Sequence, residues 1–206
     1  MIGRLNPPTT GHYFVIDKMK QFARKYGKGM VPVVVIVDGK KTGDDKERNP
    51  LTPEQRIAYM KASGRADGVR FIVAPNAFAG FEAVRKEGLE PMAIAAGSDR
   101  KDDYLRILDG HFLDAAGAKQ KHIAVDGLDR DGDGEPEVPM DDLLDELEGG
   151  NMPPISMISA SLAREAVKKD KLKAFGLITG LQKKPKLAAH MAAAIKKAGE
   201  QDAISV

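Results

Sequence analysis

The chain has 206 residues, of which 42% are hydrophobic and 30% charged, a balance typical of a globular protein with a substantial core. A formal charge of +2 gives no reason to expect bulk affinity for polyanions, and the lack of cysteine excludes disulfides and thiol chemistry. No apolar run approaches the ~20 residues needed to cross a bilayer, and the N-terminus has no signal-peptide pattern. We therefore expect a cytoplasmic protein with no membrane partner.

Apolar runs alternate with amphipathic segments as far as residue 125. Four strands buried in a parallel sheet are expected, at residues 31–37, 69–73, 91–96 and 122–125. Helices are expected at 13–23, 52–62, 77–86 and 104–108, where apolar residues recur at helical spacing. The alternation predicts an α/β fold with a doubly wound parallel sheet, whose ligands lie at the carboxyl ends of its strands.

The pattern changes after residue 125. Residues 126–152 are an insertion rich in Gly, Asp and Pro that ends in a short acidic segment, and helices are expected at 159–168, 172–181 and 185–198. We expect one domain over residues 1–164, including this insertion, and a helical extension over 165–206. The lysines of the extension favour a solvated face over a nucleic-acid surface.

The segment from Gly3 to His12 has the composition of a phosphate loop. Gly3 permits backbone conformations closed to other residues, and two prolines stiffen the approach to a helix that Thr9 or Thr10 can cap. Backbone amides at such a helix start suit a phosphate, with hydroxyls and an imidazole beside them. The simpler alternative is an ordinary capped helix in which His12 only packs or hydrogen-bonds.

A second candidate for phosphate binding lies at residues 158–164. Ser161 and Arg164 are three residues apart and so share one face of a helix start, next to Ser159. Hydroxyls, helix amides and a forked guanidinium can together hold phosphate oxygens. A serine-capped surface helix with a solvated arginine is the alternative.

These segments resemble a known family. Gly3–His12 resembles the signature turn of the cytidylyltransferase-like nucleotidyltransferases, Gly-x-Phe-x-Pro-x-(Thr/His)-x-Gly-His, with Leu5 in place of the aromatic residue. Residues 158–164 resemble its second signature, Ile-Ser-x-(Thr/Ser)-x-x-Arg. Residues 49–56 and 97–100 are similar to its Asn-Pro-(Phe/Leu) and Gly-Ser-Asp-Arg segments, in the family's order. Phage-encoded members match this wording best.

The resemblance implies a Rossmann-like sheet of the nucleotidyltransferase (HUP) type. It also implies transfer of CMP or AMP from a nucleoside triphosphate, bound with Mg²⁺, to a small acceptor bearing a phosphate or hydroxyl group, with release of pyrophosphate. His12, Thr9 and Arg164 are the implied catalytic residues. The implied nucleotide and phosphate contacts are Gly3, Arg4, Asn6, Thr10, Gly11, Lys40, Lys41, Arg56, Gly97, Ser98, Asp99, Arg100, Ser159 and Ser161.

The chain departs from the family at its first strand, because only Met1 and Ile2 precede Gly3. Such a short strand leaves its neighbours in the sheet without a partner. Residues upstream of Met1 or pairing with another chain, as in a homo-oligomer, would supply one. The alternative function is therefore a weakly active or inactive nucleotidyltransferase fold that serves as a phage virion or assembly component.

Asp129, Asp131 and Asp133 begin the chain's only stretch that reads like a calcium loop. Counted from Asp129, the twelfth position is Met140, where an EF-hand needs glutamate. A solvated acidic insertion is therefore favoured over a Ca²⁺ site.

Overall fold

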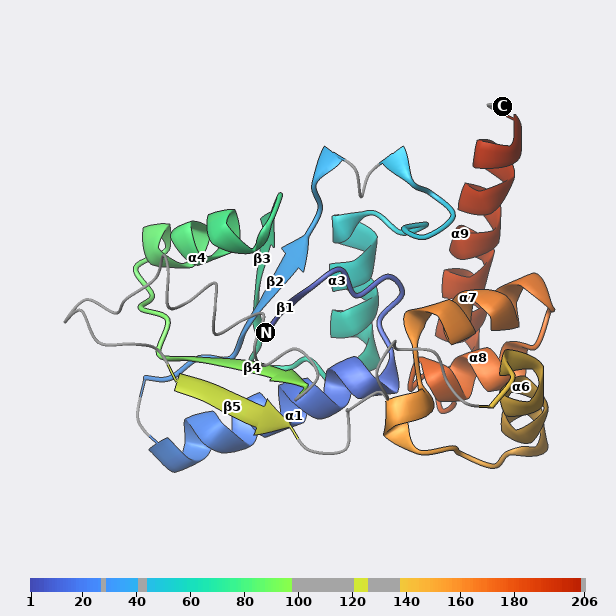
Figure 1. The fold of residues 1–206 in the computed structure, drawn as a ribbon, viewed down its shortest axis with the longest axis horizontal. Helices are drawn as coiled ribbons and strands as arrows, with labels where there is room; N and C mark the ends of the chain where they lie inside the picture. The colour runs from blue at the N-terminus through green and yellow to red at the C-terminus, as the bar shows by residue number, and fades with distance from the viewer. Residues whose placement is uncertain (27–28, 41–43, 98–120, 126–137, 205–206) are drawn as a thin grey trace. The chain divides into compact units, whose positions relative to one another are not determined.

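The computed structural model describes residues 1–26, 29–40, 44–97, 121–125 and 138–204. They form an α/β protein, as expected, and none of the described helices is long and apolar enough to span a membrane. The elements in chain order are β1 (Ile2–Gly3), α1 (Thr10–Tyr26), β2 (Val33–Val37), α3 (Pro53–Ser63), β3 (Arg70–Ala74), α4 (Ala77–Lys86), β4 (Ala93–Gly97), β5 (Lys121–Val125), α6 (Met140–Gly149), the 3₁₀ turn η2 (Ile155–Met157), α7 (Ala160–Lys168), α8 (Leu172–Ile178) and α9 (Pro185–Ile204) (Figure 1).

The chain folds into two compact units that do not follow the expected boundary at residue 164. Unit 1 comprises residues 1–4, 14–39 and 68–129, and unit 2 comprises residues 5–13, 40–67 and 130–206. The early segments join unit 2 because their apolar side chains, such as Leu51 and Tyr59, belong to the core of the C-terminal helices. The C-terminal helices are thus part of a unit built from both ends of the chain.

Unit 1 contains the strands, and all of their pairings are parallel. β1, β2 and β3 form one ladder in that order, with Ile2 opposite Val35 and Val35 opposite Ile72. β4 and β5 form a second ladder, with Ile94 opposite His122. The expected strands are present, but the described residues pair them in two ladders and not in one continuous sheet.

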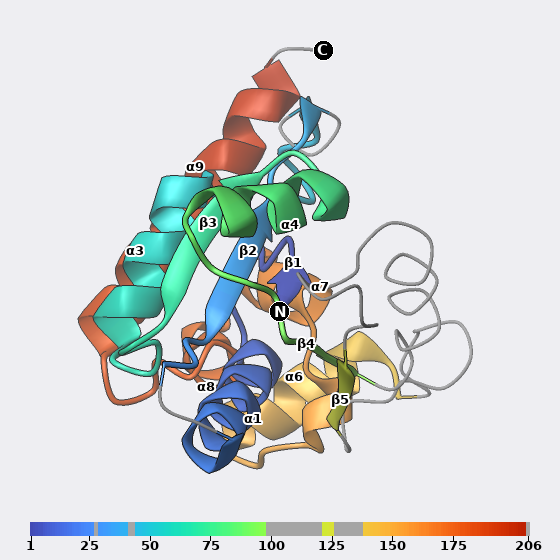
Figure 2. The same ribbon diagram turned by 90° about the vertical axis from the view of Figure 1, so that its left-hand side faces the viewer.

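Helices cover the strands of unit 1 on both sides. Val35 packs with Val84 of α4, whereas its neighbours Val34 and Ile36 point to the opposite face and are 0% exposed. From residue 14 onward, α1 packs Val15 and Met19 against β4 and the N-terminus. Figures 1 and 2 show α4 and this part of α1 on opposite sides of the strands.

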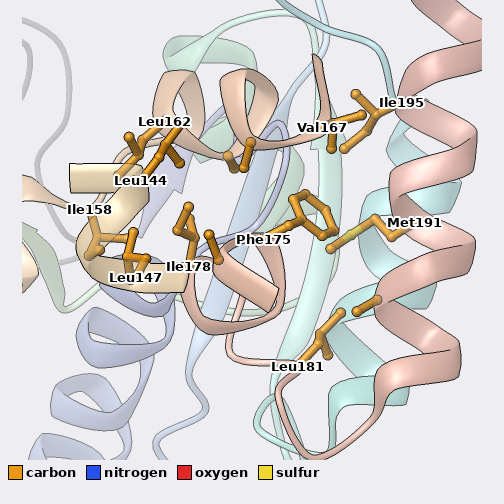
Figure 3. Close-up of a cluster of buried hydrophobic side chains, with 14 of the residues drawn as sticks. Leu144, Leu147, Ile158, Leu162, Val167, Phe175, Ile178, Leu181, Met191 and Ile195 are labelled. Atoms are coloured by element: carbon orange, nitrogen blue, oxygen red, sulfur yellow. The ribbon is translucent and has the colours of Figure 1, made fainter. Parts of the chain in front are cut away.

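Unit 2 has a helical core built from α3, α6, α7, α8 and α9 (Figure 3). Phe175 of α8 is 0% exposed and lies among side chains of α7 and α9, including Val167 and Met191. Thr52 caps α3 as expected, in a capping box that it forms with Gln55.

The acidic segment of the expected insertion is a core helix of unit 2. Leu143, Leu144 and Leu147 of α6 are at most 1% exposed and pack into the helical core. The acidic side chains of the opposite face form ion pairs with lysines that follow α7, such as Lys171 with Asp145. The leucines recur at helical spacing on one face and are buried, whereas Asp141, Asp142, Asp145 and Glu146 of the helix are exposed.

Candidate functional site

Asn6 fixes the opening turn of unit 2 to the segment that precedes α3. Its side-chain Nδ2 donates to the carbonyl of Leu51 at 2.9 Å, and its Oδ1 accepts from the Leu51 amide at 3.1 Å. Both residues are buried. The side-chain amide of Asn6 thus holds the backbone of Leu51 in place, and the direct phosphate contact that the resemblance implied for Asn6 stays a prediction.

Arg164 joins the same turn to α7. Its Nη1 donates to the backbone carbonyl of Asn6 at 2.8 Å, and its Nη2 donates to Ser161 Oγ at 3.0 Å. The two segments singled out in the sequence as phosphate-binding candidates therefore meet in unit 2. Arg164 is half-buried and Ser161 is exposed, so this part of the cluster faces solvent.

His12 takes part in capping α1. The backbone amide of Thr9 donates to His12 Nδ1 at 2.9 Å, and Thr9 Oγ1 lies 3.0 Å from the same nitrogen. His12 thus occupies the position in which a capping box usually has glutamate or glutamine. Because Nδ1 accepts a hydrogen bond from the amide, the proton of the neutral imidazole is on Nε2.

Thr10 has an unusual hydroxyl at the first position of α1. The residue is 9% exposed, and its Oγ1 is buried with no hydrogen-bond partner among the residues described. Leaving a buried polar group unsatisfied costs about 1–3 kcal/mol. Such an atom fits a site whose ligand supplies the missing hydrogen bond.

Ser159 is the N-cap of α7, and its side chain accepts from the Leu162 amide at 3.0 Å. The sequence alternative of a serine-capped helix is thus correct for Ser159 itself. The partial positive charge at the helix start remains beside Ser161 and Arg164 and favours an anion there.

Arg56 has a different environment from the one that the resemblance implied. Its side chain is 0% exposed on α3, and its Nε donates to the Thr52 carbonyl at 3.3 Å. The structure thus gives the Arg56 side chain a backbone partner at the start of α3, and the nucleotide contact that the resemblance implied for Arg56 stays a prediction.

The loop before α3 brings a carboxylate to α7. Glu47 Oε1 accepts from Lys168 Nζ at 2.9 Å. The hydrogen bond from Lys168 lowers the pKa of Glu47, and the nearby charge of Arg164 lowers it further. Neither Glu47 nor Lys168 was expected in the site, although Lys168 falls four residues after Arg164 on the same face of α7.

The remaining predicted residues lie elsewhere. Lys40 is exposed in unit 2, and Gly11 is buried in the opening turn. Unit 1 contains Gly3, Arg4 and Gly97. The residues Lys41, Ser98, Asp99 and Arg100 lie outside the described residues, so their implied roles stay predictions. Asp129, Asp131 and Asp133, for which a Ca²⁺ site was disfavoured, also lie outside them.

Within the described part of the chain, no cluster of three or more His, Cys, Asp or Glu side chains could hold a metal ion. Comparison with protein families, curated proteins and solved structures finds no match to this chain. The candidate site of unit 2 consists of the contacts among Asn6, Ser161 and Arg164, together with Thr9, Thr10 and His12 at the start of α1.

Proposed function

We propose that the protein is a nucleotidyltransferase, which transfers CMP or AMP from a nucleoside triphosphate to a small acceptor bearing a phosphate or hydroxyl group. The observation that carries the proposal is the 2.8 Å hydrogen bond from Arg164 to the Asn6 carbonyl. This bond holds the start of α7, with Ser161 and Arg164, against the turn that leads into α1 and His12. Two anion-binding elements next to each other suit a substrate with several phosphates.

Each element has its own part in the proposed site. Ser161, Arg164 and the amino end of α7 hold the β- and γ-phosphates. His12 Nε2–H donates to an oxygen of the α-phosphate, and the Thr10 hydroxyl gains in this phosphate the partner that it lacks. Thr9 keeps the imidazole in the required tautomer through its amide.

The proposed reaction is an in-line displacement at the α-phosphorus. An acceptor oxygen forms a bond to this phosphorus, and the bond to the bridging oxygen of the β-phosphate breaks. Pyrophosphate leaves with the electron pair of that bond, and a hydroxyl acceptor gives its proton to solvent. Such reactions depend on positioning and on neutralising charge as it develops, which cationic and N–H donors provide.

Magnesium would arrive with the triphosphate, as the resemblance implies. It would supply further neutralisation of the phosphate charge. The residues of the chain that would face this complex are Ser161, Arg164 and His12.

The proposal includes a single doubly wound sheet of the nucleotidyltransferase type in unit 1, with β1 between β2 and β4. A cavity of about 310 Å³ supports this order, since its lining includes Ile2 of β1, Val33 of β2 and Ala93 of β4. The two-residue β1 is the observation that favours the alternative, an inactive nucleotidyltransferase fold used as a virion or assembly component.

Pyrophosphate release tests the enzymatic proposal. We expect release from CTP or ATP with Mg²⁺ when a panel of sugar phosphates, phosphorylated amino alcohols and polyols is supplied as acceptor. His12→Ala should reduce it by about 100-fold or more, as loss of a transition-state donor does. His190→Ala is the matched control, because His190 is exposed on α9 and contacts Tyr59.

Unchanged release in the His12 variant would contradict the role given to this residue. If none of the four triphosphates is turned over or raises the melting temperature of the protein, the enzymatic proposal fails and the alternative replaces it.

A further inference from the structure

Three side chains that can bind anions share one face of α7. Ser161, Arg164 and Lys168 are spaced by three and then four residues, so they follow one another along the helix surface. Ser161 and Arg164 already contact each other through Nη2 and Oγ. Lys168 extends the face by one turn away from the helix start.

The partner of Lys168 is a single carboxylate from another segment. Glu47 bonds Lys168 at 2.9 Å, and the two side chains are 71% and 57% exposed. Arg164 also acts on Glu47, since its charge contributes to the lowered pKa of that carboxyl. Lys168, which is hydrogen-bonded to Glu47, is therefore the main partner of this carboxylate, and Arg164 contributes least.

The backbone around Glu47 is anchored on the other side of the proposed site. Leu51, four residues later, bonds the side chain of Asn6, and the Asn6 carbonyl bonds Arg164. The Glu47–Lys168 pair thus completes a ring of polar contacts among the turn, the loop and α7. It is the most exposed contact of this ring, and exposed ion pairs contribute only about 0–1 kcal/mol.

We propose that Lys168 is a further phosphate-binding residue of the proposed site and that Glu47 is the counter-ion that a polyphosphate displaces from it. The inference rests on the proposed function. It names Lys168 as a residue that raises the affinity of the proposed site for phosphate chains. A polyphosphate at Ser161 and Arg164 repels the Glu47 carboxylate and offers Lys168 a group of higher charge. Glu47 accordingly disfavours binding in the wild type, and Lys168 favours it.

Binding of inorganic pyrophosphate to the whole chain, measured by calorimetry at low ionic strength, tests the inference. Glu47→Gln should tighten the Kd about threefold, the size expected when a competing exposed ion pair is removed. Lys168→Ala should weaken it about fivefold, as loss of one partly exposed cation contact does. In the double variant with Glu47→Gln and Lys168→Ala, the Kd should equal that of Lys168→Ala alone, because the Glu47 carboxylate acts through Lys168.

Asp170→Asn is the matched control for net charge. Asp170 pairs with Lys196 at 3.0 Å, both side chains are largely exposed, and the substitution changes the charge by the same amount as Glu47→Gln. It should leave the Kd for pyrophosphate within about 1.5-fold of the wild type, as expected for a charge outside the site.

The outcomes separate this inference from the proposed function. The inference is overturned if neither Glu47→Gln nor Lys168→Ala alters the Kd for pyrophosphate. It is also overturned if Glu47→Gln and Asp170→Asn tighten binding equally. Both results leave the transferase proposal standing. If the coupling between Glu47 and Lys168 is observed without release of pyrophosphate from any triphosphate, the anion site is supported and the transferase proposal fails. The absence of pyrophosphate binding to every variant overturns the inference.

Discussion

Arg164 Nη1 lies 2.8 Å from the backbone oxygen of Asn6, a residue 158 positions earlier in the chain. Asn6 in turn binds the backbone of Leu51 with both ends of its side-chain amide. One buried residue thus connects the opening turn, the segment before α3 and the start of α7. The geometry of the proposed site depends on this connection.

Replacing Asn6 should therefore destabilise unit 2. Asn6→Ala leaves the amide and the carbonyl of Leu51 buried without their partners, and we expect the free energy of unfolding to fall by about 3 kcal/mol. Urea denaturation measures the change. Asn151→Ala is the control, since Asn151 is exposed and should alter stability by less than about 0.5 kcal/mol. Equal effects of the two substitutions would show that the bonds to Leu51 do not stabilise the fold.

Two substitutions of His12 should separate its structural role from its proposed catalytic one. Glutamine is favoured at this position of a capping box, so His12→Gln should keep the stability within about 0.5 kcal/mol, whereas His12→Ala should lose about 1 kcal/mol. Both variants should lose pyrophosphate release, because neither retains the imidazole Nε2–H. Activity in His12→Gln close to that of the wild type would assign His12 to capping alone.

Thr10→Val should stabilise the ligand-free protein. The substitution replaces a buried hydroxyl that has no partner by a methyl group of similar size, and we expect a gain of about 1 kcal/mol in the free energy of unfolding. Thr179→Val is the contrasting variant, because Thr179 is also buried but donates to the Phe175 carbonyl at 2.7 Å. That variant should be unchanged or less stable.

The same Thr10 variant tests the proposed site. Thr10→Val should weaken the binding of the nucleoside triphosphate, measured as a smaller rise in melting temperature at a fixed ligand concentration. A loss of stability of Thr10→Val in the ligand-free state would mean that the Thr10 hydroxyl is already satisfied.

Gly80 tests the packing of α4 on the sheet of unit 1. A Cβ at this position would lie 2.6 Å from Val35 Cγ1, so Gly80→Ala should cost about 1–2 kcal/mol despite the better helix propensity of alanine. Gly149→Ala in α6 is the control, because a Cβ there meets nothing within 4 Å. Combining Gly80→Ala with Val35→Ala should cost less than the sum of the single changes. Additive costs would place the strain elsewhere.

Local signals in the sequence were sufficient for much of the secondary structure. The β-branched run around Val35 predicted β2, and Thr52 with Pro53 predicted the start of α3, because the conformations of these residues are set by their own side chains and near neighbours. The parallel α/β class followed from the alternation of such segments. The calcium-like loop and the Gly97–Arg100 segment remain predictions, since most of their residues lie outside the described part of the chain.

The sequence by itself determined the spacing that places Ser161, Arg164 and Lys168 on one helix face, because a helix repeats at a fixed interval. Only the tertiary structure decided that Asn6 bonds Leu51, that Arg56 is enclosed, and that α6 is a core helix of a unit made from both ends of the chain. These outcomes depend on which apolar surfaces are buried together. Burial then decides which hydrogen-bond donors and acceptors, distant in the sequence, lie close enough to bond each other.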